Sequence, residues 1–459
     1  MQEISSSSPA PGRLTLLVGC FVTALCALLA TVGADADWLA ALGRDIAQSG
    51  SIPHGVPFAA VSSAGWHNVP VIGELVFHGL QAGLGPRGLA LAQVAAVAFC
   101  LWLLAADMRR GGIADTPAAL VMMLTAFAAA PALLAVRSQL FSLALFPLVL
   151  LLVRDEARRP SRRIWLLVPL VAVWSNLHGG VLIGIAVAAA YLLLTRLRRD
   201  PLVAVGVLGG MAVALFATPA LLSTGAYYRG VMGSVAATHG EGMWAPLSLS
   251  SPFDLVFLAT AVPLVVLALR SRPALWETVV IVALAVVAVR AGRNEVWLAL
   301  FLATPAARGL AGSRTWSVPV PRLLAVPVIA ALAALAGAGL AKSTTFVGAT
   351  PELMDTAARY AGPLPILADG PDAERLALAG HRILIGNPLD AFPKREQQLY
   401  LDWLAGRPNG DVEANRVCSI LVRKGSAPDR RLVHRPAFAP VEYEPHVVLW
   451  WRKACIELT

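Results

Sequence analysis

Two aspartates stand where the first long apolar stretch of the chain ends, a place where carboxylates could do acid–base chemistry at a membrane surface. The apolar stretch runs from Leu14 to Val32, and Asp35 and Asp37 follow it directly. A carboxylate beside an acceptor hydroxyl can act as a general base, which is worth roughly 10²- to 10⁴-fold in rate. The simpler interpretation is that these aspartates only mark the point where a helix leaves the bilayer.

Three arginines are candidates for binding an anionic group. Arg137, Arg290 and Arg293 lie at the outer ends of predicted spans, although Arg and Lys normally concentrate at cytoplasmic ends. The planar guanidinium fork suits phosphate oxygens, whereas a lone outer arginine more often contacts lipid headgroups. His178 lies in a Gly-containing segment, Asn176–Gly180, that is predicted to separate two short helices. It could bind phosphate, orient an acceptor or be a structural residue.

A divalent cation such as Mg or Mn is a further candidate ligand. Asp35 or Asp37 could bind it together with His239 and Glu241 of a later hydrophilic segment, but the spacing does not demonstrate that these groups converge. The chain has no G-x-x-x-x-G-K-[ST], H-E-x-x-H or paired C-x-x-C motif, and its predicted cytoplasmic loops are too short for a nucleotide-binding domain.

The composition indicates an integral membrane protein. Of 459 residues, 57% are hydrophobic and only 14% are charged, with a mean hydropathy of +0.68. The apolar blocks approach the roughly 20 residues that a helix needs to cross a bilayer, and they lack strand-like alternation. The net charge of +9 comes from arginines clustered between these blocks. Membrane topology therefore explains the charge better than nucleic-acid binding does.

The order of blocks and clusters predicts an all-α polytopic bundle of about eleven helices, with the N-terminus inside and the C-terminus outside. The basic clusters at 109–110, 154–163, 196–199, 270–272 and 308–314 all fall on the inner side of this topology. Residues 1–340 would form the membrane domain, with outer loops at about 34–70 and 223–252. The expected spans are 14–32, 88–106, 117–136, a fourth ending near 154, two short helices within 164–190, 203–222, three ending near 270, 290 and 308, and 323–340.

From residue 341 onward the composition becomes hydrophilic. Short β-like runs, Ile383–Ile385 and Cys418–Val422, flank a helix-like segment at Lys394–Trp403. We expect residues 341–459 to form a small α/β domain on the outer side. In an oxidising compartment Cys418 and Cys455 could form a disulfide, but a lone pair has no diagnostic spacing, so the pairing stays open.

Several strings, taken in order, resemble the GT-C glycosyltransferase superfamily, in particular a bacterial branch related to the dolichyl-phosphate-mannose protein mannosyltransferases. The first outer loop of that branch reads D-x-W-W-H-L-x-x-G-R-x-I, then I-P-x-x-D-P-F-S, G-x-x-W and W-L-x-E. The corresponding strings here are Asp35–Ile46, Ile52–Pro53, Pro57–Phe58, Gly65–Trp66 and Glu74. Two later strings, Val136–Ser142 and Trp174–Gly180, also resemble that branch. Three positions depart from the pattern: Leu39 replaces a His, Val56 replaces an Asp, and Glu241 is separated from Trp244 where the family has Glu-Trp.

The resemblance implies a glycosyltransferase whose donor sugar is linked to a polyprenyl phosphate. It places the active face on the periplasmic side of a bacterial inner membrane, with an envelope glycan, lipid or protein as acceptor. Asp35 would be the general base of an inverting reaction, with Asp37 in support. The implied substrate and lipid-phosphate residues are Trp38, Trp66, Glu74, Arg137, His178, Glu241, Arg290 and Arg293.

Two other functions stay open. A transporter or lipid flippase would need a basic lining, but polar groups near the bilayer midplane and repeated halves, which transporters usually have, are scarce here. A catalytically inactive envelope scaffold is the second, because Leu39 and Val56 replace polar residues of the family pattern. The sequence identifies neither the sugar nor the acceptor.

Overall fold

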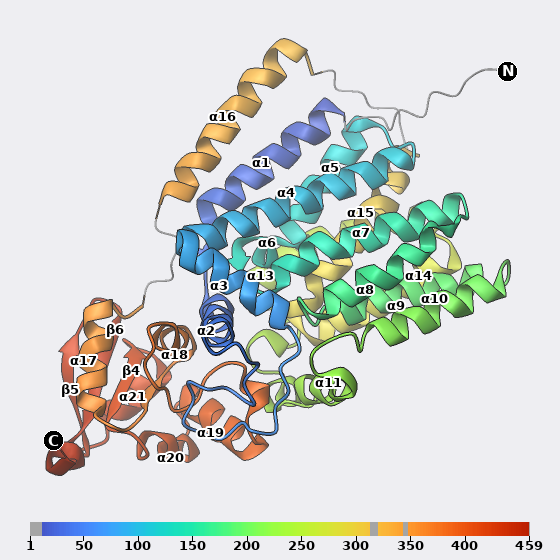
Figure 1. The fold of residues 1–459 in the computed structure, drawn as a ribbon. Coiled ribbons are helices and arrows are strands. Elements are labelled where there is room, and N and C mark those ends of the chain that lie inside the picture. The colour runs from blue at the N-terminus through green and yellow to red at the C-terminus, as the bar shows by residue number, and fades with distance from the viewer. Residues whose placement is uncertain (1–11, 313–319, 343–347, 459) are drawn as a thin grey trace, which may run out of the picture. The chain divides into compact units, whose positions relative to one another are not determined.

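The computed structural model describes residues 12–312, 320–342 and 348–458 (Figure 1). The chain forms two compact units, and each is assembled from segments distant in the sequence. Unit 1 consists of Met1–Ala30, Ala90–Ala217 and Gly242–Thr344, and unit 2 consists of Thr31–Leu89, Thr218–Glu241 and Thr345–Thr459.

Unit 1 is a helical bundle. The α4 helix begins at Pro86, within a segment of unit 2, and belongs to unit 1 from Ala90 onward. Its elements are α1 (Arg13–Leu29), α4 (Pro86–Arg110), α5 (Asp115–Ala128), α6 (Ala130–Leu134), β2 (Ala135–Val136), α7 (Gln139–Arg158), α8 (Leu167–Ser175), α9 (Val181–Tyr191), α10 (Pro201–Ala214), α13 (Pro252–Arg270), α14 (Leu275–Arg290), α15 (Glu295–Ala311) and α16 (Arg322–Ala341).

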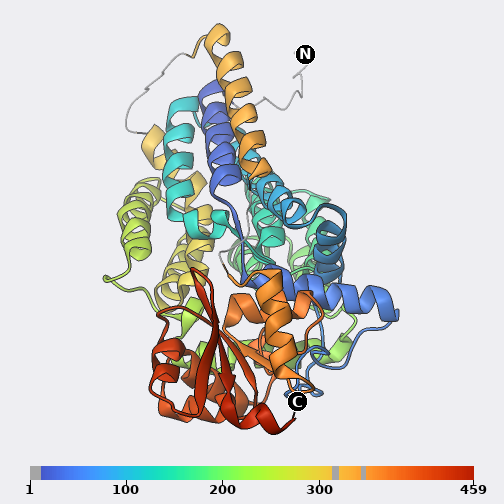
Figure 2. The same cartoon turned by 90° about the vertical axis from the view of Figure 1, so that its left-hand side faces the viewer.

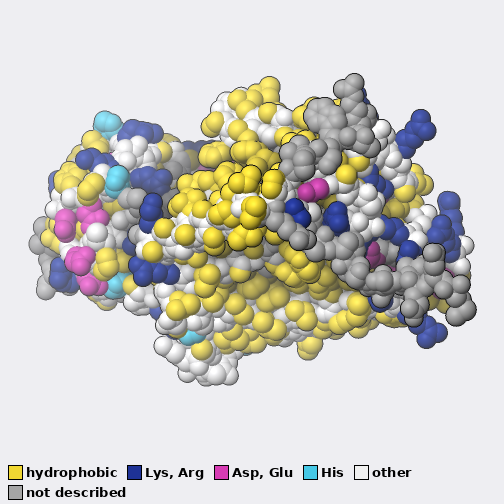
Figure 3. All heavy atoms as spheres, turned by 90° about the horizontal axis from the view of Figure 1, so that it is seen from above, with side chains coloured by type: hydrophobic (Ala, Val, Ile, Leu, Met, Phe, Trp, Pro, Cys, Tyr) yellow, Lys and Arg dark blue, Asp and Glu magenta, His cyan; other side chains and the backbone are white. Residues whose placement is uncertain are grey.

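Several of these helices are apolar on their outer faces as well as their inner ones. By length and composition, α4, α13 and α16 could each cross a membrane. Large hydrophobic side chains on α13, α14 and α16 are exposed, and Figure 3 shows hydrophobic groups over much of the surface seen from above. A helix that is hydrophobic all round needs an apolar environment, which for these helices is lipid.

Glycines allow close packing between helices of unit 1. A Cβ atom on Gly339 would lie 2.6 Å from the carbonyl oxygen of Ala27, so α16 can approach α1 closely only because it has no side chain there. The two helices lie side by side in Figures 1 and 2. Gly309 plays the same part where α15 meets α13, since its Cβ would lie 1.8 Å from Leu267 O. Small residues at such contacts are typical of helix packing in membranes.

A buried ionic network ties one end of unit 1 together. Asp107 of α4 accepts hydrogen bonds from Arg154 of α7 and Thr304 of α15, each at 2.6 Å. Glu277 of α14 accepts from Arg308 at 2.6 Å and lies 3.8 Å from Arg154. Arg154 and Arg308 belong to two basic clusters that the predicted topology places on the same side of the membrane. In the structure both arginines pair with Glu277.

Unit 2 contains the remaining α-helices and strands. They are β1 (Thr31–Val32), α2 (Ala34–Ser49), α3 (Val71–Leu84), α11 (Thr224–Met232), α12 (Val235–His239), α17 (Pro351–Ala361), β3 (Ile366–Ala368), α18 (Gly370–Leu378), α19 (Lys394–Leu404), α20 (Asp411–Ala414), β4 (Ser419–Arg423), α21 (Ala427–Val433), β5 (Phe438–Tyr443) and β6 (Val447–Arg452).

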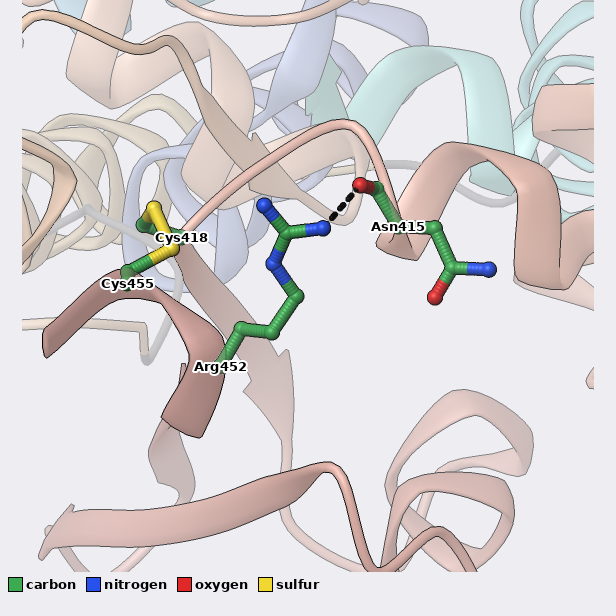
Figure 4. The surroundings of a disulfide bond; sticks show 4 residues. All are labelled: Asn415, Cys418, Arg452 and Cys455. Atoms are coloured by element: carbon green, nitrogen blue, oxygen red, sulfur yellow. Dashed lines mark hydrogen bonds between the residues drawn. A yellow bond between two sulfur atoms is a disulfide. The ribbon is translucent and has the colours of Figure 1, made fainter. Parts of the chain in front are cut away.

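A four-stranded sheet organises unit 2, in the order β3-β4-β6-β5 (Figure 2). β3 and β4 are parallel, whereas β6 runs antiparallel to both β4 and β5. A disulfide joins Cys418, directly before β4, to Cys455, just after β6 (Figure 4). This disulfide, which the sequence did not decide, thus links the ends of two neighbouring strands. The Cα atoms of the two cysteines are 5.9 Å apart.

The first predicted outer loop joins this sheet. Ile383 forms parallel bridges with Ile366 of β3 on one side and with Ala59 on the other. Ala60 N donates to Ile383 O at 2.8 Å, and Val61 N donates to Leu384 O at 3.0 Å. Thr345–Thr459 therefore form one compact unit with Thr31–Leu89 and Thr218–Glu241. The predicted division at residues 340 and 341 stays a prediction.

The element boundaries differ from the expected ones in several places. The helix break at Asn176–Gly180 is confirmed, since α8 ends at Ser175 and α9 begins at Val181. The expected span 117–136 is instead two helices, α5 and α6, and the expected span 203–222 ends as a helix at Ala214. The loop predicted at 34–70 begins with the four-turn helix α2. The count of eleven crossings and the inside–outside orientation stay predictions.

Candidate active site

A cavity of about 200 Å³ opens in unit 1 beside two of the predicted phosphate-binding arginines. Arg137 and Arg293 both line it, with Gln139 and Glu295 as the other polar groups. The rest of its lining is small or apolar: Ala128, Ala129, Pro131, Ala132, Ala135, Met243, Gly292 and Val296. Two guanidinium groups in a largely apolar cavity are suited to an anionic headgroup attached to a hydrocarbon.

Local backbone structure places these arginines. Arg137 lies between β2 and the start of α7, and Arg293 lies in the single 3₁₀ turn between α14 and α15. The guanidinium carbon of Arg293 stands 4.3 Å from the centre of the Trp244 ring, a cation–π contact. Gly292 N donates to Ala245 O at 3.0 Å, which fastens this turn to the segment that carries Trp244. Arg290 is exposed at the end of α14 and does not line the cavity.

Glu295 brings a carboxyl group to the same cavity, which sequence reasoning missed. It is the first residue of α15 and is only 6% exposed. Its Oε1 has no hydrogen-bond partner among the residues that the structure describes. A buried polar atom without a partner is costly unless a ligand or water supplies one. The Arg293-Asn294-Glu295 string directly after α14 was the available signal.

His178 belongs to a second polar group in unit 1. Its Nδ1 lies 2.6 Å from Ser142 Oγ, and Trp174 Nε1 donates to the same oxygen at 2.7 Å. Ser142 closes the string Val136–Ser142, and Trp174 opens the string that contains His178. Two motifs that are separate in sequence therefore form one hydrogen-bonded network.

Asp35 and Asp37 lie in the first turn of α2 in unit 2, where a helix dipole favours negative charge. The rest of the motif holds this helix in place. A Cβ on Gly43 would lie 2.1 Å from Glu74 O, so the glycine permits α2 to pack on α3. Arg44 donates to the carbonyl oxygens of Leu378 at 2.5 Å and of Ala377 at 3.2 Å, at the C-terminal end of α18.

Asp37 has an unusual electrostatic setting. Burial raises its pKa to about 6, and the Arg375 guanidinium of α18 acts in the opposite direction. Arg375 also pairs with Asp372 at 3.7 Å. Burial, together with the neighbouring Asp372, raises the pKa of Asp369 to about 6. Sequence reasoning missed these C-terminal partners of Asp37, because only the fold brings α18 against α2.

The other predicted residues of the first loop are mostly buried. Glu74 is fully buried and accepts a hydrogen bond from Asn68 Nδ2 at 2.5 Å. Trp66 packs against Tyr227 with 6.4 Å between ring centres, and Trp38 is 9% exposed. Among the described residues, the Nε1 atoms of both tryptophans lack hydrogen-bond partners.

The departures from the family pattern are explained by packing. Leu39 is 1% exposed and Val56 is 5% exposed, so apolar core contacts have replaced a polar His and a polar Asp. Glu241 lies 3.6 Å from Arg407 as an ion pair within unit 2. Such a partner gives Glu241 a structural role that the sequence did not suggest.

The proposed metal ligands do not gather into a site. Within residues 12–312, 320–342 and 348–458, no group of three His, Cys, Asp or Glu side chains is placed to hold a metal ion, and this includes Asp35, His239 and Glu241. The arginine cavity belongs to unit 1 and the aspartates of α2 belong to unit 2. The convergence of Asp35 with the arginines stays a prediction.

Comparison with known proteins adds the fold relationship. No protein-family model matches this sequence, and no curated protein does. Among solved structures, ArnT from Cupriavidus metallidurans bound to undecaprenyl phosphate aligns with a TM-score of 0.52 and 16% identity, over 95% of this chain and 97% of that one. The apo structure of the same protein aligns with a TM-score of 0.51 and 16% identity, over 95% and 96% of the two chains.

These alignments cover nearly the whole chain, and together with the long apolar helices they indicate a multi-pass membrane protein. The chain therefore has the fold of ArnT.

Proposed function

We propose that this protein is a GT-C-type membrane glycosyltransferase that takes its sugar from a polyprenyl-phosphate-linked donor. The observation that carries the proposal is the cavity lined by Arg137 and Arg293 in a membrane-type helical unit. ArnT, whose fold the chain shares, has been crystallised with undecaprenyl phosphate. Undecaprenyl phosphate has an anionic headgroup on an apolar chain, and a ligand of this kind suits the cavity.

In the proposed reaction, Asp35 deprotonates an acceptor hydroxyl. The oxygen attacks the anomeric carbon from the face opposite the lipid phosphate, so the configuration inverts and the phosphate departs with the bonding electrons. The arginines would stabilise the negative charge that develops on that phosphate. Asp37, whose pKa is raised to about 6, is mostly ionised near neutral pH and would support the site as a hydrogen-bond acceptor.

Binding of undecaprenyl phosphate tests the cavity. We expect Arg137→Gln and Arg293→Gln each to weaken binding to the detergent-solubilised full-length protein by about tenfold or more, because each removes a charge-assisted hydrogen bond. Arg290→Gln is the matched control, since it removes the same charge from an exposed position outside the cavity. Equal losses in all three variants would contradict a specific cavity site.

Sugar transfer tests the base. Purified protein should transfer sugar from a polyprenyl-phosphate donor, and Asp35→Asn should abolish transfer while thermal unfolding stays unchanged. Asp45→Asn, on the same helix, should retain transfer. Full activity of Asp35→Asn would remove Asp35 from the mechanism. Repeating the assay with EDTA, then with added Mg²⁺ or Mn²⁺, tests the predicted requirement for a divalent cation.

We place the active face in the periplasm, on the outer side of a bacterial inner membrane, with an envelope molecule as acceptor. The disulfide between Cys418 and Cys455 supports an oxidising compartment for unit 2. An inactive scaffold is the second candidate, favoured by the buried Leu39 and Val56. It would bind the lipid without transferring sugar, whereas a flippase would move labelled lipid across liposomes without forming a glycosidic bond.

A further inference from the structure

The hydrogen bonds around His178 determine which ring nitrogen carries the proton. Gly180 N lies 3.2 Å from His178 Nδ1 and donates to it. A backbone N–H can only donate, so Nδ1 must present a lone pair. Ser142 Oγ, which accepts from Trp174 Nε1, can then donate its own hydrogen to Nδ1. The neutral ring thus carries its proton on Nε2.

Buried packing keeps this arrangement in place. Ser142 and Trp174 are both fully buried. A Cβ on residue 180 would lie 2.6 Å from Ser142 Oγ and 2.9 Å from His178 Nδ1, so a glycine is needed there. A Cβ on Gly184 would lie 2.4 Å from the Trp174 ring, so α9 packs directly on the indole. His178 itself is partly exposed, and its orientation is set by groups that are not.

The network lies close in sequence to the cavity lining. Gln139, which lines the cavity, and Ser142 are three residues apart in α7, a spacing that puts both on one helix face. Arg137 immediately precedes that helix. Ser142, which orients His178, therefore lies on the same face of α7 as Gln139, which lines the cavity.

We propose that Ser142 is a positioning residue, which fixes His178 so that its Nε2–H donates a hydrogen bond to a phosphate oxygen of the lipid-linked ligand. The inference rests on the proposed function, and it assigns a role to a serine outside the predicted site. Trp174 supports Ser142 by occupying its acceptor lone pair, so that the hydroxyl hydrogen stays directed at the imidazole. A neutral donor of fixed direction would complement the arginine charges by orienting the phosphate.

A double-mutant cycle with undecaprenyl phosphate tests this role in the full-length protein. We expect Ser142→Ala and His178→Ala each to weaken binding by about tenfold, and the double variant to be no weaker than His178→Ala, because Ser142 acts through His178. Ser142→Thr, which keeps the hydroxyl, should restore binding. Additive losses, or unchanged binding in both single variants, would overturn the inference.

NMR of protein labelled with ¹⁵N-histidine gives a readout that does not depend on ligand. The His178 signals are assigned by their loss in His178→Ala. In the wild type we expect a protonated Nε2 and an unprotonated Nδ1, and in Ser142→Ala the same tautomer, held by Gly180 N alone, with a shifted Nδ1 signal. A proton on Nδ1 in the wild type would refute the network.

The two proposals fail in different ways. Wild-type protein that does not bind undecaprenyl phosphate would overturn the proposed function and this ligand assignment together. Binding that Arg137→Gln weakens but that His178→Ala and Ser142→Ala leave intact would overturn only the role of His178.

Discussion

Asp37 stands two residues after Asp35 in the same helical turn, yet its ionisation is governed by a distant part of the chain. Burial raises its pKa to about 6, and Arg375 of α18 keeps it from rising further. A carboxyl group that ionises near neutral pH is typical of functional sites, where stability is often given up for a poised group. The free-energy cost of ionising the partly buried Asp37 should lower the stability of the folded protein measurably.

Asp37→Asn should therefore stabilise the protein in a pH-dependent way. The pKa of Asp37 in the folded protein is raised above its ordinary value of 3.8. The stability that the protonated Asp37 gives the folded state is therefore fully present below about pH 4 and is lost as pH rises to about 6. Above pH 6 we expect the variant to be more stable than the wild type by about 2–3 kcal/mol, and at pH 4 to be equal. Thermal unfolding from pH 4 to 8 checks this, with the exposed Glu352→Gln as control. A pH-independent difference would contradict it.

Between elements, the contact of α2 with α3 depends on the absence of a side chain at Gly43. We predict that Gly43→Ala destabilises the protein by about 1–3 kcal/mol, because the added methyl group would strike the Glu74 carbonyl, 2.1 Å from the Cβ position. Gly79→Ala on α3 is the matched control: its Cβ would meet nothing within 4 Å, and a helical alanine should stabilise by about 0.5–1 kcal/mol. The same sign for both variants in thermal unfolding would argue against close packing at Gly43.

The buried ionic network of unit 1 makes a second prediction about helix packing. Asp107, 1% exposed, binds Arg154 at 2.6 Å and Arg158 at 2.7 Å, so Asp107→Ala leaves the buried guanidinium of Arg154 with only its longer contact, 3.8 Å, to Glu277. We expect a loss of about 3–5 kcal/mol. Asp155→Ala removes an exposed carboxylate that pairs with Arg110 and Arg158, and it should cost less than about 1 kcal/mol. Unfolding in detergent compares the two, and similar losses would exclude a special role for burial.

At the scale of the whole molecule, the three chain segments that make up unit 2 bear on the membrane topology. Three segments, 31–89, 218–241 and 345–459, fold into one compact unit, and a bilayer does not run through such a unit. We therefore predict that both expected outer loops and the C-terminal segment lie largely on one face of the membrane. The sheet that joins Ala59, Ile383 and β3 is the physical reason.

The redox state of the cysteines tests which face this is. Cys418 and Cys455 form a disulfide, whereas Cys20, Cys26 and Cys100 are free thiols. In protein taken from cells and denatured without reductant, we expect maleimide–polyethylene glycol to modify three cysteines, and five after reduction. Modification of all five without reductant would place unit 2 in a reducing compartment and contradict a periplasmic active face. Cys418→Ser with Cys455→Ser is the control for band assignment.

The sequence by itself determined the features that depend on local composition. Apolar blocks of spanning length indicated a helical membrane protein, and the glycines around His178 predicted the helix break that separates α8 from α9. The ordered motifs predicted a membrane glycosyltransferase fold, and the chain has the fold of ArnT. The length of an apolar segment and the presence of helix-breaking residues are local properties, so they can be recognised in the amino-acid sequence alone.

Only the tertiary structure decided which distant residues meet. It brought Arg137 to the same cavity as Arg293 while leaving Arg290 outside, joined Ser142 to His178, and set Arg375 beside Asp37. It also paired Cys418 with Cys455 and merged the first loop with the C-terminal sheet. These contacts depend on how helices and strands pack across long separations in sequence, and no local pattern encodes them.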